Sequence, residues 1–210
     1  MPTDAPTAFA VRRETRFGER VVLSFADRPP SVHAMFERSL ARDPARDAVV
    51  FEGRRTSWGA LDDAAGRLAA ALAARGLAAG ERVVMLLSNR PEFVVALLAV
   101  LRLGAIAVPV SIREQAPGLA YVLGQCGAAA IVFDDGLADR LPAPGADGPL
   151  RLRLAASEAA ALAIGPQAPL REAAPVHEED TGLILYPSGT TGRPMGALLS
   201  QVGMVHSGRH

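Results

Sequence analysis

The sequence predicts an α/β domain in which helices cover both faces of a mainly parallel sheet. From about residue 59 to residue 133, segments with helical spacing of apolar residues alternate with short, continuously apolar segments. The short segments Arg82 to Leu87, Ala105 to Val110 and Ala129 to Phe133 are typical of strands buried on both faces. The chain is 50% hydrophobic and 21% charged, which is enough apolar material for a sizeable core. These observations favour a three-layer domain with the sheet in the middle.

The first part of the chain is less regular. Residues 1–30 are weakly patterned, and we expect an N-terminal arm with one strand over Arg20 to Phe25. Ser31 can cap a helix that extends through Leu40, because apolar residues then recur at helical spacing. Residues 48–58 read as a β-hairpin with Gly53 at the turn.

The following segments build the α/β alternation. A helix is predicted from about Gly59 to Ala74, before the first of the apolar strands. Ser88 or Asn89 can cap the next helix, with Pro91 in the first turn, where proline is tolerated.

One apolar stretch resembles a membrane span in length. From Phe93 to Ile112 the only charged residue is Arg102. Gly104 and Pro109 interrupt the stretch, so we interpret it as a helix, a glycine stop and a buried strand. The sequence therefore predicts no membrane span.

The C-terminal third contains weaker signals. A helix is expected near Pro117 to Gln125, and residues 141–175 are mostly loop. Within that loop region Arg151 to Leu154 favours a strand and Ser157 to Ile164 a short helix. An apolar strand, Leu183 to Tyr186, comes next.

Composition excludes several function classes. The 22 basic residues balance the 22 acidic residues, so there is no electrostatic signature of nucleic-acid binding. All the basic residues are arginine, which excludes a lysine nucleophile, a Schiff base and a Walker lysine. The single cysteine, Cys126, favours a reducing compartment and is interpreted as a core residue. Residues 1–10 show no signal peptide, and we expect a cytoplasmic protein.

A loop rich in glycine and hydroxyl side chains follows the last apolar strand, with the sequence Pro187-Ser-Gly-Thr-Thr-Gly-Arg-Pro-Met-Gly196. Its glycines let the backbone approach a ligand closely, and its hydroxyls and successive amides can surround an anion. The arginine adds a fixed positive charge. The candidate phosphate-binding residues are Ser188, Gly189, Thr190, Thr191, Gly192 and Arg193.

Other common site motifs do not fit this chain. The spacing of a Walker loop, of the dinucleotide fingerprint G-x-G-x-x-G and of the nucleophile motif G-x-S-x-G is missing. The histidines show no metal or triad spacing, and we interpret each as a surface or loop residue without a catalytic role. They are His33, His177, His206 and His210.

The segment from Tyr186 to Ser200 resembles the signature loop of the AMP-binding, adenylate-forming superfamily. That superfamily includes acyl-CoA synthetases, luciferases and the adenylation domains of peptide synthetases. Upstream segments resemble its framework in the same order, notably Thr56-Ser-Trp58, Gly80 to Glu92 and Leu103 to Pro109. The similarity extends from about residue 30 to the end. It implies a partial adenylation domain over residues 31–210, with an incomplete sheet that ends after the phosphate loop.

The resemblance implies an acyl-CoA synthetase. Such an enzyme activates a carboxylic acid, here guessed to be a fatty acid, with ATP and Mg²⁺ and then forms a thioester with coenzyme A. Residues 188–192 would surround the β- and γ-phosphates, and Thr190 would lie nearest the Mg²⁺. No catalytic residue is assigned within this chain.

Three positions depart from the family pattern. Met195 replaces the usual lysine, Pro187 replaces a threonine, and Gln201 replaces a histidine. The family's acid pocket, adenine and ribose contacts and catalytic lysine lie downstream of the loop, so we expect the chain to be inactive alone. Two alternatives remain open: a noncatalytic remnant, and half of a split enzyme that acts with a complementing chain. Either way, we expect an open sheet edge and an uncovered apolar face.

Overall fold

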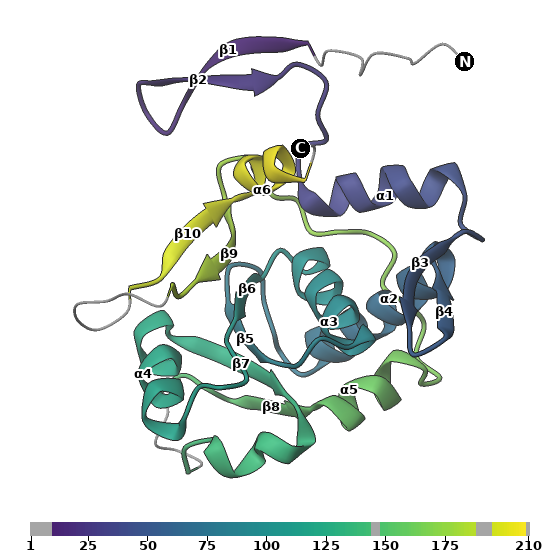
Figure 1. Cartoon of the computed structure of the whole chain (residues 1–210), viewed down its shortest axis with the longest axis vertical. Coiled ribbons are helices and arrows are strands. Elements are labelled where there is room, and N and C mark those ends of the chain that lie inside the picture. The colour runs from purple at the N-terminus through teal and green to yellow at the C-terminus, as the bar shows by residue number, and fades with distance from the viewer. Residues whose placement is uncertain (1–9, 144–147, 188–194, 209–210) are drawn as a thin grey trace.

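The computed structural model describes residues 10–143, 148–187 and 195–208, and among these residues a six-stranded sheet forms the centre (Figure 1). Its strands are β5 (Arg82–Leu86), β6 (Ile106–Pro109), β7 (Ala128–Phe133), β8 (Leu152–Ala155), β9 (Thr181–Leu185) and β10 (Ala197–Ser200). The spatial order is β10-β9-β6-β5-β7-β8. All neighbours are parallel except β10, which runs antiparallel to β9. The predicted α/β fold with a mainly parallel sheet is confirmed.

Helices cover the two faces of this sheet and form two cores. The helices are α2 (Trp58–Ala74), α3 (Pro91–Arg102), α4 (Ala116–Cys126) and α5 (Ala156–Ala163). Side chains of α2, α3 and α5 pack with Val83 and Met85 of β5, while those of α4 pack with Val84 and Leu86. Successive residues of a strand point to opposite faces, so the four residues 83–86 of β5 must all be apolar to fill both cores.

Polar side chains hold the start of α1 and the turn that precedes α3. Ser31 caps α1 (Val32–Arg42), and its hydroxyl accepts a hydrogen bond from the amide of Ala34 at 3.1 Å. The predicted cap of α3 is wrong: the N-cap is Arg90, and Pro91 occupies the first turn. The amide of Ser88 instead donates to the Asp134 carboxylate, at 2.9 Å. The turn after β5 is thus held by the residue that follows β7, a long-range contact that local pattern cannot reveal.

The N-terminal segment forms a hairpin above the rest of the molecule (Figure 1). It consists of β1 (Val11–Arg16) and β2 (Arg20–Phe25), of which the sequence predicted only the second. Glu14 accepts a hydrogen bond from Arg28 at 2.7 Å, and Arg28 also donates to Glu178 at 3.0 Å. These charge-assisted hydrogen bonds, chiefly the one from Arg28, hold the pKa of Glu14 well below its usual range. Ionic contacts therefore attach the hairpin to the body, together with a hydrogen bond from the Phe25 amide to Nε2 of His206 at 2.9 Å.

The remaining elements are one predicted hairpin and two helices that the sequence analysis did not predict. They are the predicted hairpin β3 (Asp47–Phe51) and β4 (Arg54–Ser57), the 3-10 helix η1 (Asp135–Arg140) and the C-terminal helix α6 (Gln201–Ser207). The apolar stretch that resembles a membrane span divides into α3 and β6, as expected. In the part of the chain that the structure describes, no helix has the length and hydrophobicity needed to cross a bilayer.

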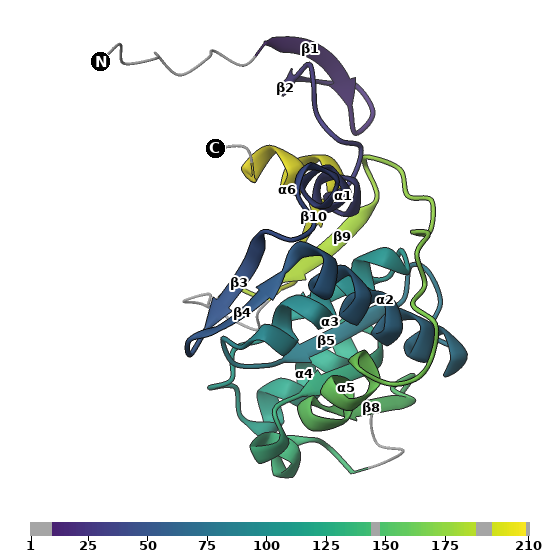
Figure 2. The same ribbon diagram turned by 90° about the vertical axis from the view of Figure 1, so that its right-hand side faces the viewer.

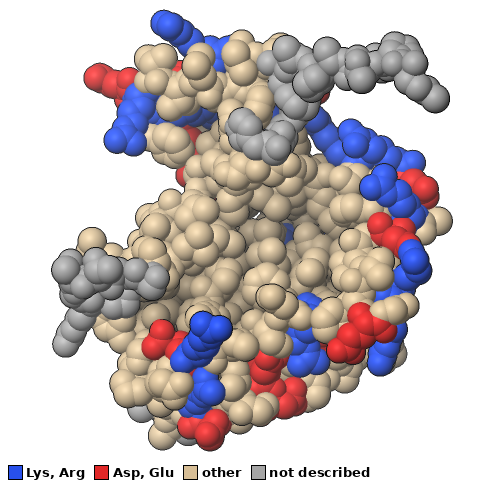
Figure 3. Space-filling view, in the orientation of Figure 1, with Lys and Arg blue, Asp and Glu red and all other residues tan. Residues whose placement is uncertain are grey.

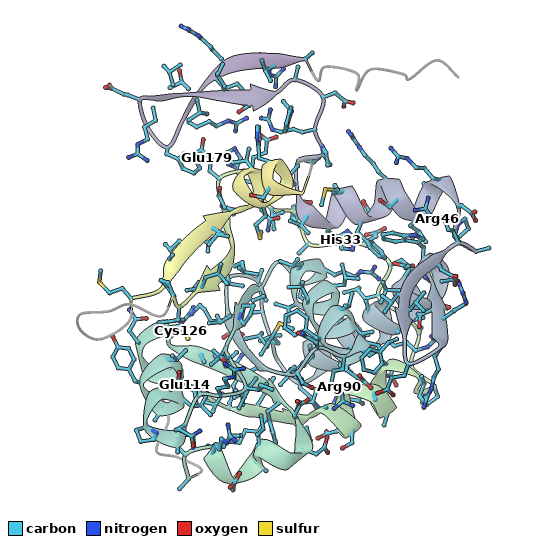
Figure 4. The ribbon with its side chains drawn as sticks, in the orientation of Figure 1. His33, Arg46, Arg90, Glu114, Cys126 and Glu179 are labelled. Atoms are coloured by element: carbon cyan, nitrogen blue, oxygen red, sulfur yellow. The ribbon has the colours of Figure 1, made fainter. Side chains whose placement is uncertain are left out.

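A fully buried arginine joins several of these elements. Arg102, at the end of α3, forms an ion pair with the carboxylate of Asp62 on α2. It also donates to the carbonyl of Leu170 at 2.7 Å and to Nε2 of His33 at 2.9 Å. The interpretation of His33 as a surface residue is therefore wrong: it belongs to the first turn of α1, and its side chain is buried against the core (Figure 4). His206 is also engaged, because its ring stacks on Phe25 with centroids 4.4 Å apart.

We expect Asp62→Ala to destabilise the chain by about 3–5 kcal/mol, because it leaves the buried Arg102 without its carboxylate. Asp63→Ala is the matched control. Asp63 pairs with Arg67 and Arg171 at the surface, so its loss should cost less than about 1 kcal/mol. Urea denaturation followed by circular dichroism measures both. Equal shifts for the two variants would contradict the role of the buried pair.

We further expect the stability to fall as the pH drops through about 6.5, the ordinary pKa of histidine. Burial, and then the charge of Arg102, lower the pKa of His33, while Glu37 and Asp62 oppose this shift. The unfolded chain therefore binds a proton more readily than the folded chain, so acidification favours unfolding. His33→Gln keeps an acceptor for Arg102 but cannot titrate. Denaturation midpoints between pH 7.5 and 5.5 should fall less in this variant than in the unmodified chain, and identical slopes would contradict the prediction.

Candidate phosphate-binding edge

At the carboxyl edge of the parallel sheet, the connections that follow two neighbouring strands leave on opposite faces of the sheet. The connection that leaves β5 forms α3 on one face, whereas the connection that leaves β6 forms α4 on the opposite face. A crevice between two such neighbouring strands is the usual ligand site of open α/β sheets. Strand β9 lies beside β6 and runs parallel to it, so its carboxyl end reaches the same edge.

The predicted phosphate loop begins at this edge. Residues 188–194, which include all six candidate ligands, lie outside the described residues, so their predicted roles remain untested. The flanking strands are described, and Leu185 of β9 pairs with Ala197 of β10. Antiparallel pairing brings the two ends of the intervening segment together. Consequently residues 186–196 connect two paired strands at the carboxyl edge.

The residues at the two ends of this loop are placed by close packing. The hydroxyl of Tyr186 hydrogen-bonds to Oε1 of Gln125 on α4. Burial, with a contribution from neighbouring Cys126, raises the pKa of Tyr186 to about 12. A Cβ added to Gly196 would lie only 2.6 Å from Cγ2 of Ile184. A larger residue at 196 would therefore disturb the strand pair that carries the loop.

Two positions next to the loop bear on its chemistry. Met195, which stands where the resemblance calls for lysine, is 77% exposed. Its side chain is thus free of core packing, and a lysine could replace it without a steric change in the core. Burial raises the pKa of the Cys126 thiol, which keeps it protonated and agrees with its interpretation as a core residue.

Ionic contacts at the start of α3 involve residues that the sequence analysis did not select. Arg90 donates to Glu92 at 2.8 Å and to Asp134 at 3.2 Å, and the hydrogen bond from Arg90 lowers the pKa of Glu92. The sequence feature that could have identified Asp134 was its position directly after an apolar strand. Arg90 is already paired with two carboxylates, so it is not a free anion-binding group.

Beside this turn lies a cavity of about 690 Å³ between the β3–β4 hairpin and the start of α3. Its polar lining includes Ser88, Asn89 and Arg54. The described residues contain no group of three metal-ligating side chains. Mg²⁺ is commonly held by nucleotide phosphates and one or two protein oxygens, so a role for Thr190 does not require such a group.

Comparison with known proteins assigns the class. The sequence matches the family described as AMP-binding enzyme over residues 36–210. The chain therefore belongs to the AMP-binding, adenylate-forming enzymes, as an N-terminal portion of their large domain. This confirms the resemblance inferred from the loop and its framework.

Curated relatives include multidomain peptide synthetases. The isonitrile lipopeptide synthase of Mycobacterium tuberculosis is 35% identical over 195 residues, which cover 92% of this chain and 7% of that protein. Tyrocidine synthase 1 of Brevibacillus parabrevis is 29% identical, over 84% of this chain and 16% of that protein. The chain thus spans a small fraction of the relatives it matches.

Solved structures with the same fold include an anthranilate CoA ligase. The N-terminal domain of FACL13 from Mycobacterium tuberculosis superposes with a TM-score of 0.76 at 26% identity, over 82% of this chain and 44% of that one. The anthranilate CoA ligase AuaEII, solved with anthranoyl-AMP, gives 0.75 at 25% identity over 81% and 34%.

We expect Gly196→Ala to destabilise the chain by about 1–3 kcal/mol, because its Cβ would overlap the buried, branched Ile184. Gly124→Ala on α4 is the control. A Cβ at that site meets nothing within 4 Å, and alanine is the better helix former, so a gain of about 0.5–1 kcal/mol is expected. Urea midpoints test the pair. An unchanged urea midpoint for Gly196→Ala would show that the strand pair next to the loop tolerates the added methyl group.

Proposed function

We propose that this chain supplies the triphosphate-binding part of an enzyme that activates a carboxylic acid as an acyl-adenylate. The observation that carries the proposal is the location of the Ser/Gly/Thr-rich loop: it connects β9 to β10 at the carboxyl edge, where the chain leaves β5 and β6 on opposite faces of the sheet. Membership of the AMP-binding family supports the same reaction class.

In this proposal the loop residues act on the nucleotide. The amides and hydroxyls of residues 188–192 surround the β- and γ-phosphates, Arg193 adds charge, and Thr190 contacts Mg²⁺. Such groups favour pyrophosphate departure because they stabilise negative charge that develops in the transition state. Met195 leaves one cation fewer at this site than the family pattern provides, which predicts weaker adenylation.

Two overall reactions, which differ in the activated acid and in its acceptor, are supported by different observations. Acyl-CoA synthetase activity, with a fatty or aromatic acid and coenzyme A, is supported by structural similarity to the anthranilate CoA ligase AuaEII. Amino-acid activation for peptide synthesis is supported by the sequence relatives, which include tyrocidine synthase 1. A cytoplasmic location is compatible with both.

We infer that protein outside these 210 residues contributes contacts to the adenosine and the acid, because the chain covers only 44% and 34% of two solved chains of the same fold. Edge strand β10 is a candidate place for such protein to attach. It carries the exposed Leu198, and the surface over β10 is free of charged side chains in Figure 3. We propose that the rest of the domain, in the same polypeptide or in a complementing chain, covers this apolar strand.

We expect these 210 residues alone to give no exchange of labelled pyrophosphate into ATP with fatty, aromatic or amino acids. The solved adenylate-forming chains are more than twice the length that this chain matches, and nucleotide positioning requires contacts from several segments. Robust exchange by the isolated chain would show that residues 1–210 suffice.

We expect activity when residues 1–210 replace the corresponding stretch of a complete adenylate-forming enzyme. In that chimera Met195→Lys should raise exchange several-fold, because an ammonium group within ~4 Å of a phosphate is attractive even at a partly screened site. Thr190→Val should lower exchange by about tenfold or more.

Thr181→Val, at the opposite end of β9, serves as the control and should change little. If the chimera folds and binds no ATP under any of these substitutions, the noncatalytic alternative would replace the proposal. In an active chimera, the acid that supports exchange distinguishes the two proposed substrate classes: a fatty or aromatic acid favours the acyl-CoA synthetase proposal, and an amino acid favours peptide synthesis.

A further inference from the structure

A second cavity lies under α1, among elements that do not contribute to the phosphate loop. It is an open depression of about 240 Å³ that is lined by α1, β3, α2 and α3. All but one of its lining residues are apolar, and the exception is Ser39. The rings of Phe36 and Trp58 line it at a centroid distance of 5.5 Å. The apolar lining of this depression favours contact with an apolar molecule over contact with water.

The cavity continues into a polar recess at the end of α1. Ser39 and Trp58 line both spaces, and the recess adds Arg42, Asp43 and Arg46. Arg46 lies where the chain passes from α1 to β3 (Figure 4). An apolar interior therefore opens beside two arginines.

The recess is held by backbone contacts, so its shape does not depend on the exposed side chains alone. The Arg46 carbonyl accepts from the amide of Trp58 at 3.0 Å, and the Pro44 carbonyl accepts from the amide of Gly59 at 2.8 Å. The Asp43 carboxylate accepts from the amides of Ala45 and Arg46, at 3.0 and 3.2 Å. These two hydrogen bonds hold the Asp43 carboxylate against the backbone of its own turn.

The two arginines of the recess differ from their neighbour Arg38. Arg38 pairs with Asp27 at 3.3 Å. Among residues 10–143, 148–187 and 195–208, the guanidinium groups of Arg42 and Arg46 contact no carboxylate. A net positive rim at the mouth of an apolar cavity selects a molecule with an apolar body and one anionic end.

We propose that this cavity is an accessory binding site for a small amphipathic carboxylate, with its hydrocarbon part against Phe36 and Trp58 and its carboxylate beside Arg42 and Arg46. The site is built within residues 32–98, apart from the loop at residues 186–196. It would bind without ATP, and the proposal does not depend on the proposed adenylation activity.

Trp58 is the only tryptophan of the chain, so its fluorescence reports on this cavity directly. Octanoate added to the 210-residue chain without nucleotide should give a saturable change in emission and raise the thermal midpoint, because it binds the folded state. Octylamine, with the same hydrocarbon length and opposite charge, should bind at least about fivefold more weakly.

The double variant Arg42→Gln/Arg46→Gln should weaken octanoate binding about fivefold and leave octylamine binding unchanged or stronger. Arg38→Gln is the matched control and should have little effect, since that arginine is already paired. Ala48→Leu, which extends a side chain into the cavity, should abolish the fluorescence change while far-ultraviolet circular dichroism stays unchanged. No saturable response, equal affinity for the two probes, or an equal effect of Arg38→Gln would each overturn the proposal.

Discussion

The buried ion pair between Arg102 and Asp62 is the interaction on which the arrangement of this molecule depends. Arg102 ends α3 and has no exposed surface, so its charge is tolerable only with complete polar pairing. Its partners come from α1, α2 and the segment that leads to β9. A Cβ on Gly66 would lie 2.7 Å from its guanidinium, so glycine permits the close approach of α2. One side chain thereby sets the positions of four segments.

The segment after α5 shows how this constraint reaches the candidate site. It runs past α2 before it arrives at β9 (Figure 2). Leu170 donates its amide to the Gly66 carbonyl at 3.0 Å, and Ala174 donates to the Arg102 carbonyl at 2.8 Å. These contacts fix the course of a segment that lacks regular structure. As a result β9 enters the sheet beside β6, and the loop that follows opens at the carboxyl edge.

Two different kinds of binding surface emerge from the same framework. At the carboxyl edge, backbone geometry and a hydroxyl-rich loop favour a polyphosphate, and the exposed strand β10 leaves room for further protein. Under α1, aromatic and aliphatic side chains beside Arg42 and Arg46 favour a small amphipathic anion. The first surface follows from how parallel strands end, and the second follows from how a helix and a hairpin meet on the outside of α2 and α3. Their separation allows each to be tested without the other.

The sequence by itself determined the strand and helix order, because both signals are local. Apolar segments such as Val83–Leu86 are buried on both faces, and caps such as Ser31 satisfy amides of their own helix. It also identified the family, since the loop and framework segments are contiguous in the chain. Only the tertiary structure decided which strands are neighbours, that Asp134 rather than a local cap holds the turn after β5, and that His33 and Arg102 meet in the core. The physical reason is distance along the chain. Hydrogen bonds and ion pairs between residues tens of positions apart depend on packing. The local periodicity of apolar residues in the sequence does not predict them.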